Sequence, residues 1–285
     1  MGTAKSITTG PKARCVPAEQ GAVSDRLQLR SSFLLAPLPA AGEYDVGRLR
    51  GRSRFAEIVE CGISKRMDII WDGVRKAKTL TDEARAIRHR LANATRSYNW
   101  NDALTLLSKH PELINTTRLD GLSLYSPLHQ AAHGGAPTEV VEQMLKLGAW
   151  RTLQNSKGER PVDVAGTRNH KHLISVLRPR YKHNVPLGVL LKIQQNFHDV
   201  IIGRAQQFVE EHNLRLPELE PMLELNDPKL WFAVPGMYGG FHYWLEVKSA
   251  ETKLVTESWC RIHGGSGQRH EITSAGSQLM EEGFV

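Results

Sequence analysis

The fold of this chain is decided by the stretch Asp120-Gly121-Leu122-Ser123-Leu124-Tyr125-Ser126-Pro127-Leu128-His129-Gln130-Ala131-Ala132. A shorter copy follows, with Lys157-Gly158 in place of the first dipeptide and Arg160-Pro161-Val162-Asp163-Val164-Ala165 in place of the Pro-Leu-His segment. Glycine tolerates the backbone of a tight turn. A proline suits the first turn of a helix, because the amide at that position has no intrahelical partner. Each copy therefore predicts a turn followed by a short helix.

A second helix is predicted after each of these short helices. The run from Leu173 to Leu177 supplies it in the second copy. In the first copy, apolar residues recur at helical spacing at Val140, Val141, Met144, Leu145 and Leu147. The repeating unit is therefore a turn, a helix, another turn and a second helix.

The two copies resemble ankyrin repeats. Pro127 and Pro161 are 34 residues apart, close to the ankyrin period, and Ser126-Pro127-Leu128-His129-Gln130-Ala131 resembles the family signature Thr-Pro-Leu-His-x-Ala. The segment from about Glu83 to Asn115 reads as a divergent first repeat, which suits the end of an array. The resemblance implies an all-α, ankyrin-like helical repeat stack over roughly residues 82–180, a structural role for His129, and a protein-binding function.

The resemblance also implies where a partner would bind, namely at the turn tips and on the exposed side of the first helix of each pair. Carried onto this sequence, the candidate partner-binding residues are Arg118, Leu119, Leu122, Leu124, Tyr125, Gln130, His133, Trp150, Arg151, Gln154, Asn155 and Lys157. Trp150 has two interpretations. It anchors a partner if it is exposed, or it packs against the neighbouring repeat or the C-terminal region, which is the interpretation we prefer.

A different pattern begins at about residue 185, after a polar link bounded by prolines. Apolar residues from Leu187 to Val209 recur at helical spacing, which predicts one long amphipathic helix. Alternation of period two then predicts strands at Leu230–Val234, Phe241–Val247, Lys253–Ile262 and Arg269–Thr273. We therefore predict an α+β fold, in which the helical repeats precede a small domain over residues 185–285. In that domain the long helix packs on a three- or four-stranded antiparallel sheet.

Residues of this C-terminal domain also allow a chemical interpretation. Cys260 and His263, with His242 and His270, are of types that bind zinc, but a second closely spaced ligand pair is lacking. The Gly264–Gly267 run precedes a strand pattern, whereas a phosphate loop precedes a helix, so a hairpin turn is favoured.

Two further sets of side chains are open to a functional and a structural interpretation. One set has the residue types of nucleophilic catalysis without a nucleophile elbow, at Ser258, Ser266, His263, His270 and Glu271. The other set either lines a ligand cleft or forms core, with core preferred, and comprises Tyr238, Phe241, Tyr243, Trp244 and Trp259. We expect no catalytic residue, no metal and no cofactor. The alternative is an enzymatic, small-ligand or metal-binding C-terminal domain that the repeats target.

The positive charge is concentrated before the presumed folded part. The chain of 285 residues carries a net charge of +7, of which residues 1–66 contribute +5 and residues 67–285 only +2. A groove that follows nucleic-acid phosphates needs clustered basic residues, so we expect no nucleic-acid partner. Nucleic-acid binding through the arginines at positions 48, 50, 52 and 54 stays as a third alternative, with a solvated run as the preferred interpretation.

Residues 1–66 contain no tryptophan, no histidine and no sustained apolar period, which predicts a disordered leader. Two interpretations of Met67 remain open: it is an internal residue, or it is the biological start of the protein. Residues 67–81 form an N-terminal extension of the repeats.

The sequence as a whole predicts an adaptor. The three cysteines are far apart, which favours a reducing compartment, and no run of 18 apolar residues is present, which excludes a membrane-spanning helix. We expect a cytoplasmic protein without catalysis that binds another protein, with no membrane partner.

Overall fold

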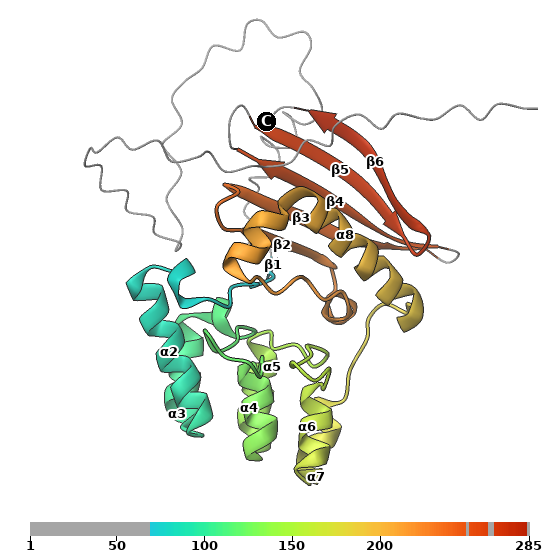
Figure 1. Cartoon of the computed structure of the whole chain (residues 1–285). Coiled ribbons are helices and arrows are strands. Elements are labelled where there is room, and N and C mark those ends of the chain that lie inside the picture. Colours follow the sequence, from blue (N-terminus) through green and yellow to red (C-terminus); the bar gives the residue numbers. More distant parts are fainter. Residues whose placement is uncertain (1–68, 249–250, 262–264, 284–285) are drawn as a thin grey trace, which may run out of the picture.

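The computed structural model describes residues 69–248, 251–261 and 265–283. The predicted leader over residues 1–66 lies outside these ranges. Three helix pairs lie in a row on one side of the molecule, and a sheet covered by one long helix lies on the other (Figure 1). We call these the helical part and the sheet part.

The helical part consists of paired helices. The pairs, in chain order, are α2 (Asp82–Arg96) with α3 (Trp100–Lys109), α4 (Pro127–Gly134) with α5 (Thr138–Lys146), and α6 (Pro161–Thr167) with α7 (Lys171–Leu177). Short 3-10 turns, η1 (Ala77–Thr79) and η2 (Pro111–Leu113), lie before and after the first pair. Each helix contacts its own partner and the corresponding helix of the next pair.

Local sequence explains where these helices begin. The side chain of Thr81 accepts a hydrogen bond from the amide of Ala84, and Ser126 caps α4 just before Pro127. The helices share one apolar core, and its fully buried side chains include Leu107, Leu128, Met144, Leu173 and Leu177, with alanines at the close contacts.

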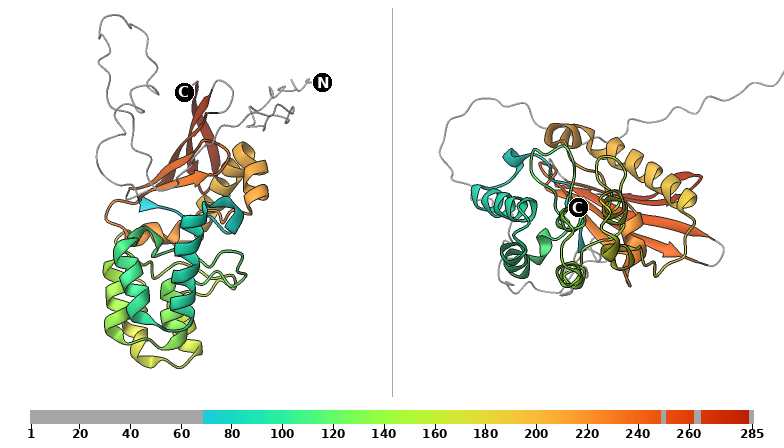
Figure 2. Two further views of the ribbon diagram at one scale, coloured as in Figure 1. Left: turned by 90° about the vertical axis from the view of Figure 1, so that its left-hand side faces the viewer. Right: turned by 90° about the horizontal axis from the view of Figure 1, so that it is seen from below.

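The sheet part has six strands in the order in which they occur in the sequence. They are β1 (Ile69–Ile70), β2 (Lys229–Val234), β3 (Gly239–Val247), β4 (Thr252–Cys260), β5 (Ser266–Thr273) and β6 (Gly276–Gly283). The strands from β2 to β6 are antiparallel, whereas β1 is parallel to β2, with Ile69 opposite Leu230. Helix α8 (Leu187–His212) lies along one face of the sheet, and a 3-10 turn, η3 (Glu220–Glu224), follows it (Figures 1 and 2).

The core of the sheet part lies between α8 and the sheet. Alternate residues of the central strands face the helix, and Tyr243 packs against Phe197 of α8 with ring centroids 4.9 Å apart. Residues paired across neighbouring strands point to the same face of a sheet. Tyr243 pairs with Thr256, and Thr256 pairs with His270, so all three are on the face that α8 covers. The other face carries Trp231 and Trp259, whose rings stack at 4.7 Å.

The predicted fold class was wrong in two respects. The predicted sheet was antiparallel with three or four strands, whereas the described sheet is mixed and has six. The predicted helix-only stack followed by a sheet domain is not what the chain forms, because β1 precedes the helices and pairs with β2, which follows them. The α+β arrangement of a long helix on a sheet is present.

Two tryptophans join the helical part to the sheet part. Trp71 follows β1 and Trp150 follows α5, and their rings stack with centroids 5.7 Å apart. Both are buried, at 2% and 4% exposure, and both belong to the apolar core of the sheet part. The segment before the first helix pair and the segment after the middle pair therefore rest on the sheet part.

Candidate partner-binding groove

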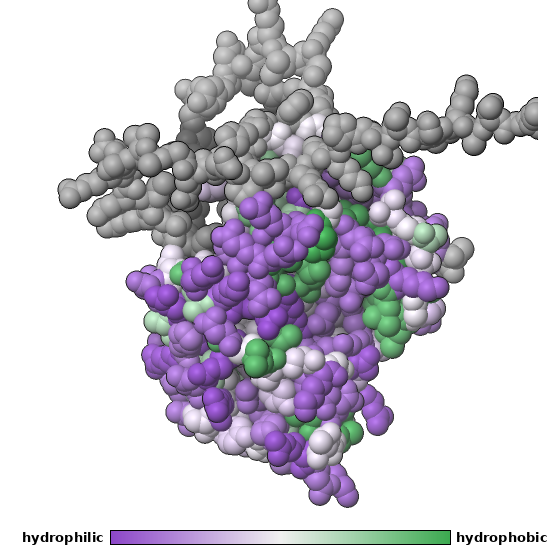
Figure 3. All heavy atoms as spheres, in the orientation of Figure 1, coloured by the Kyte–Doolittle hydropathy of each residue, from purple (hydrophilic) through white to green (hydrophobic). Residues whose placement is uncertain are grey.

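A groove of about 700 Å³ lies on the helical part. Helices α2 and α4 and the turns between the helix pairs contribute its lining. We call residues 116–126 finger 1 and residues 149–160 finger 2. The lining residues include Arg88, Ala92, Arg96, Tyr98, Arg118, Leu122, Ser123, Tyr125, Gln130, His133, Asn155, Ser156 and Lys157. Hydrophilic side chains dominate the helical part on the face shown in Figure 3.

The groove is positively charged. Its lining contains four Lys or Arg side chains and no Asp or Glu. Arg88 is neutralised by an ion pair with Asp72, and Arg118 donates to Oδ1 of Asn93 at 3.1 Å. Within the described ranges, Arg96 and Lys157 take part in no ion pair. Three cationic groups therefore remain without a carboxylate partner.

Aromatic rings and an imidazole form the end of the groove near α4. Gly134 leaves room for the ring of Tyr98, which a Cβ at that position would hit. Nε2 of His133 accepts from the guanidinium of Arg168, so its Nδ1 carries the proton toward the hydroxyl of Tyr98 at 2.9 Å. Tyr125 packs edge-on against His133, with centroids 5.9 Å apart. Burial and the charge of Arg168 lower the pKa of His133.

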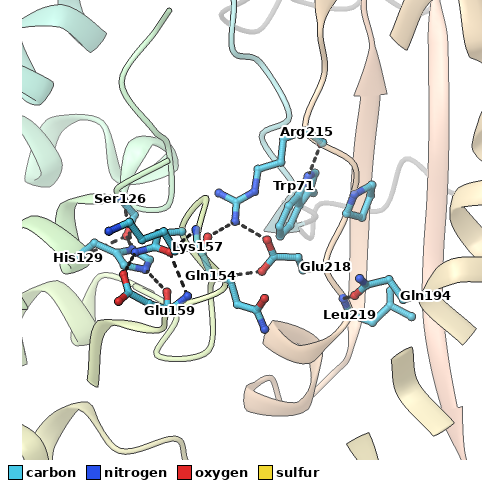
Figure 4. A network of polar contacts seen from close by, with 12 residues as sticks. Trp71, Ser126, His129, Gln154, Lys157, Glu159, Gln194, Arg215, Glu218 and Leu219 are labelled. Atoms are coloured by element: carbon cyan, nitrogen blue, oxygen red, sulfur yellow. Dashed lines mark hydrogen bonds and ion pairs between the residues drawn. The ribbon is translucent and has the colours of Figure 1, made fainter. Parts of the chain in front are cut away.

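His129 connects finger 1 to finger 2 beneath the groove. Nδ1 of His129 accepts from the amide of Ser126 at 3.4 Å, and Nε2 lies 3.1 Å from the carbonyl oxygen of Glu159 (Figure 4). The ring is fully buried. Burial lowers its pKa from 6.5 to about 4. The predicted structural role of this imidazole is confirmed by these bonds.

Finger 2 is held by the side chain of Asn155. Its Oδ1 accepts from the amide of Lys157 at 2.8 Å and from the amide of Glu159 at 3.0 Å. The amide of Ser156 donates to the carbonyl oxygen of Ser123, which joins the two fingers directly at 3.0 Å. These bonds fix the backbone from which Lys157 projects.

Finger 1 is held from the N-terminal side. The amide of Asp120 donates to the carbonyl oxygen of Arg75 at 2.7 Å, and its Oδ1 accepts from the amide of Ala77 at 3.3 Å. The segment 71–81, for which the sequence suggested no role, thus crosses from the sheet part to the tip of the finger.

Finger 2 also meets the sheet part through hydrogen bonds to partly buried charged side chains. Arg215 binds the carboxylate of Glu218 and the carbonyl oxygen of Gln154, and Glu218 accepts from the amide of Gln154 at 3.0 Å (Figure 4). Glu224 accepts from both the amide and the hydroxyl of Thr152, at 2.9 and 2.7 Å. Burial raises the pKa of both carboxyl groups.

The structure divides the predicted partner-binding residues into two sets. Those that line the groove are Arg118, Leu122, Tyr125, Gln130, His133, Asn155 and Lys157. Those outside the lining are Leu119, Leu124, Trp150, Arg151 and Gln154. Leu119 is buried and Leu124 half-buried.

The prediction that Trp150 serves as a partner-binding residue is wrong, because the ring is buried on Trp71; the packing interpretation is the one that holds. Arg151 and Gln154 face the junction as well. Arg151 donates to the carbonyl oxygen of Val176 at 3.0 Å and lies 3.7 Å from Glu224.

The sequence reasoning missed the contribution of α2. Arg88, Ala92 and Arg96 follow one another at intervals of four residues and line the groove together. That spacing is visible in the sequence, but the first helix pair lacks the Pro-Leu-His segment, so the resemblance places no binding residue on it.

The residues proposed for chemistry in the sheet part do not form one site. His242 and His270 lie on opposite faces of the sheet, and His263 lies outside the described residues. No group of three His, Cys, Asp or Glu in the described part of the chain is placed to hold a metal ion. Ser258 and Ser266 both bind the buried guanidinium of Arg204, at 3.2 and 2.8 Å.

The five aromatic residues of the sheet part have different surroundings. Phe241 and Tyr243 are buried in the core, Trp244 and Trp259 are half-buried on the opposite face, and Tyr238 is exposed. They do not line one cleft together. No helix in residues 69–248, 251–261 and 265–283 is both long and apolar enough to cross a membrane.

No protein-family model matches the sequence, and no curated protein matches it. One solved structure that is similar is that of a predatory endopeptidase from Bdellovibrio bacteriovorus in complex with an immunity protein, at a TM-score of 0.26 and 22% identity. The likeness covers 43% of this chain and 54% of that chain, and at this TM-score it supports no statement about fold or function.

Proposed function

We propose that this chain is an adaptor that binds another protein through the groove, with the helix pairs acting as ankyrin-type repeats. Leu122 is the observation that supports this most directly. It projects from finger 1 at the rim of the groove with 84% of its surface exposed, the highest value among the exposed large hydrophobic side chains of the described residues. Leu122 offers apolar surface beside a preformed groove, and a partner that covers it removes that surface from water.

The way the fingers are held supports the same proposal. The fingers are hydrogen-bonded to one another, and in addition finger 1 is bonded to the segment 71–81 and finger 2 to the sheet part. A partner that docks on fixed loops loses less conformational entropy than one that must order them first. The sheet part therefore serves to keep the groove in its binding conformation, and no bond-breaking step is proposed.

We expect the substitution Leu122→Asp to abolish capture of the protein partner by the full chain. The exposed side chain makes no core contact, so the free energy of unfolding should change by no more than about 0.5 kcal/mol. The measurement is affinity capture from cell extract, followed by identification of the captured proteins by mass spectrometry.

A matched control is Leu191→Asp, because Leu191 is 58% exposed on α8 in the sheet part. Proteins that the wild type and Leu191→Asp retain, and that Leu122→Asp loses, are groove partners. Loss of the same proteins only on Leu191→Asp would instead assign binding to the sheet part.

A further inference from the structure

We propose that the groove receives an acidic segment of its protein partner, one that combines carboxylates with apolar side chains. This inference rests on the proposed function and specifies the chemistry of the partner. It starts from the charge of the lining, which contains four Lys or Arg and no carboxylate.

In the described part of the chain, nearby carboxylates form no ion pair with Arg96, Arg118 or Lys157. Asp72 is paired with Arg88, which also lines the groove. The carboxylate of Asp120 accepts from the amide of Ala77, and that of Glu159 accepts from Nδ2 of Asn155 at 2.8 Å. Arg96 and Lys157 therefore line the groove without a carboxylate in direct contact, and carboxylates of a partner complement them.

The cationic groups come from three segments of the chain. Arg96 lies in the last turn of α2, whereas Arg118 and Lys157 belong to fingers 1 and 2. Separate cations along one lining favour an extended acidic chain over a single bound carboxylate.

The apolar part of the lining distinguishes a protein from a nucleic acid. Leu91, Leu122 and Pro127 line the groove together with Tyr125. A phosphate backbone gains nothing from covering the exposed Leu122, whereas a leucine or phenylalanine side chain would bury it. Residues 67–285 carry a net charge of only +2, which is a small excess of positive charge for a phosphate-binding surface.

The experiment is selection of short peptides from a random display library on the immobilised full-length protein, with affinities then measured by fluorescence anisotropy. We expect the selected peptides to be acidic and to contain apolar residues. Their affinity should fall roughly tenfold or more in the variant Arg96→Glu, Lys157→Glu, and by less in Arg96→Gln, Lys157→Gln. It should also weaken as salt rises from about 0.05 M to about 0.5 M, because the Debye length shortens.

The matched control reverses two charges away from the groove, in Lys146→Glu, Lys171→Glu. Lys146 lies in the last turn of α5, as Arg96 does in α2, and Lys171 begins α7. Both control side chains are exposed, and neither lines the groove. This variant should bind the peptides as the wild type does.

The outcomes separate the two proposals. The selected peptides could be neutral or basic and still fail to bind the Leu122→Asp variant. That result would overturn the proposal of an acidic partner and leave the groove as a protein-binding site. Tighter binding of a short single-stranded RNA than of any selected peptide would overturn the protein nature of the partner. Selection of no groove-dependent peptide would count against both.

Discussion

Replacing Trp150 by alanine is expected to lower the free energy of unfolding by about 3–5 kcal/mol, the usual cost of removing a buried Trp or Phe side chain. The ring is 4% exposed and stacks on Trp71, over which the guanidinium of Arg215 lies at 5.3 Å. The substitution leaves a cavity at the point where finger 2 rests on the sheet part. We therefore expect partner binding to weaken as well, although Trp150 does not line the groove.

The measurement is urea unfolding followed by far-UV circular dichroism. Leu122→Ala is the control, because an exposed side chain in a finger should change the free energy of unfolding by no more than about 0.5 kcal/mol. Equal and small effects of the two substitutions would contradict the buried tryptophan pair as the link between the helical and sheet parts.

Acidification is expected to destabilise the folded protein through His129. The pKa of this imidazole is about 4 in the folded protein and 6.5 as its ordinary value. Below pH 6.5 the unfolded chain binds a proton that the folded chain excludes. The stability contributed by neutral His129 is therefore complete above pH 6.5 and is lost as the pH falls from 6.5 toward 4. Linkage gives a loss of about 3 kcal/mol by pH 4.

The physical cause is the surroundings of the ring. Burial removes water from the imidazolium, and the positive charge of Arg215 disfavours a second positive charge on the ring. The test compares wild type with His129→Gln by urea unfolding from pH 7 to pH 4. The wild type should lose about 3 kcal/mol more than the variant over this range. Parallel losses in the two proteins would show that another group carries the acid sensitivity.

The helices and the central strands could be predicted from local patterns. Pro127, Pro161 and the capping side chains Thr81 and Ser126 specify helix starts that depend only on neighbouring residues. Strands β2 to β5 alternate between a face on α8 and an opposite face, which produces a visible period of two.

The missed elements lack such a local signal. Strand β1 has only two residues, too few for any period, and it pairs with a strand about 160 positions later, at Leu230. Strand β6 is mostly exposed and polar, so no alternation marks it. Whether Trp150 is buried depended on Trp71, which lies in a segment with no repeat pattern.

The candidate site was predicted in part for the same reason. The finger residues Leu122, Tyr125 and Lys157 could be placed because the repeat pattern fixes the turn tips. Arg88 and Arg96 could not be placed in the site, because their helix departs from the Pro-Leu-His signature. Only the packing of α2 beside α4 brings them to the groove.

The most direct test of the groove as a protein-binding site is photo-crosslinking in cells. A photoreactive amino acid is placed either at Leu122, on the groove rim, or at Lys146, on the second helix of the middle pair. The account predicts that irradiation joins a distinct protein to the chain at position 122 and not at position 146. It also predicts that Arg96→Glu, Lys157→Glu abolishes that crosslink. Equal crosslinking at both positions, or crosslinks at position 122 that the charge reversal leaves unchanged, would contradict it.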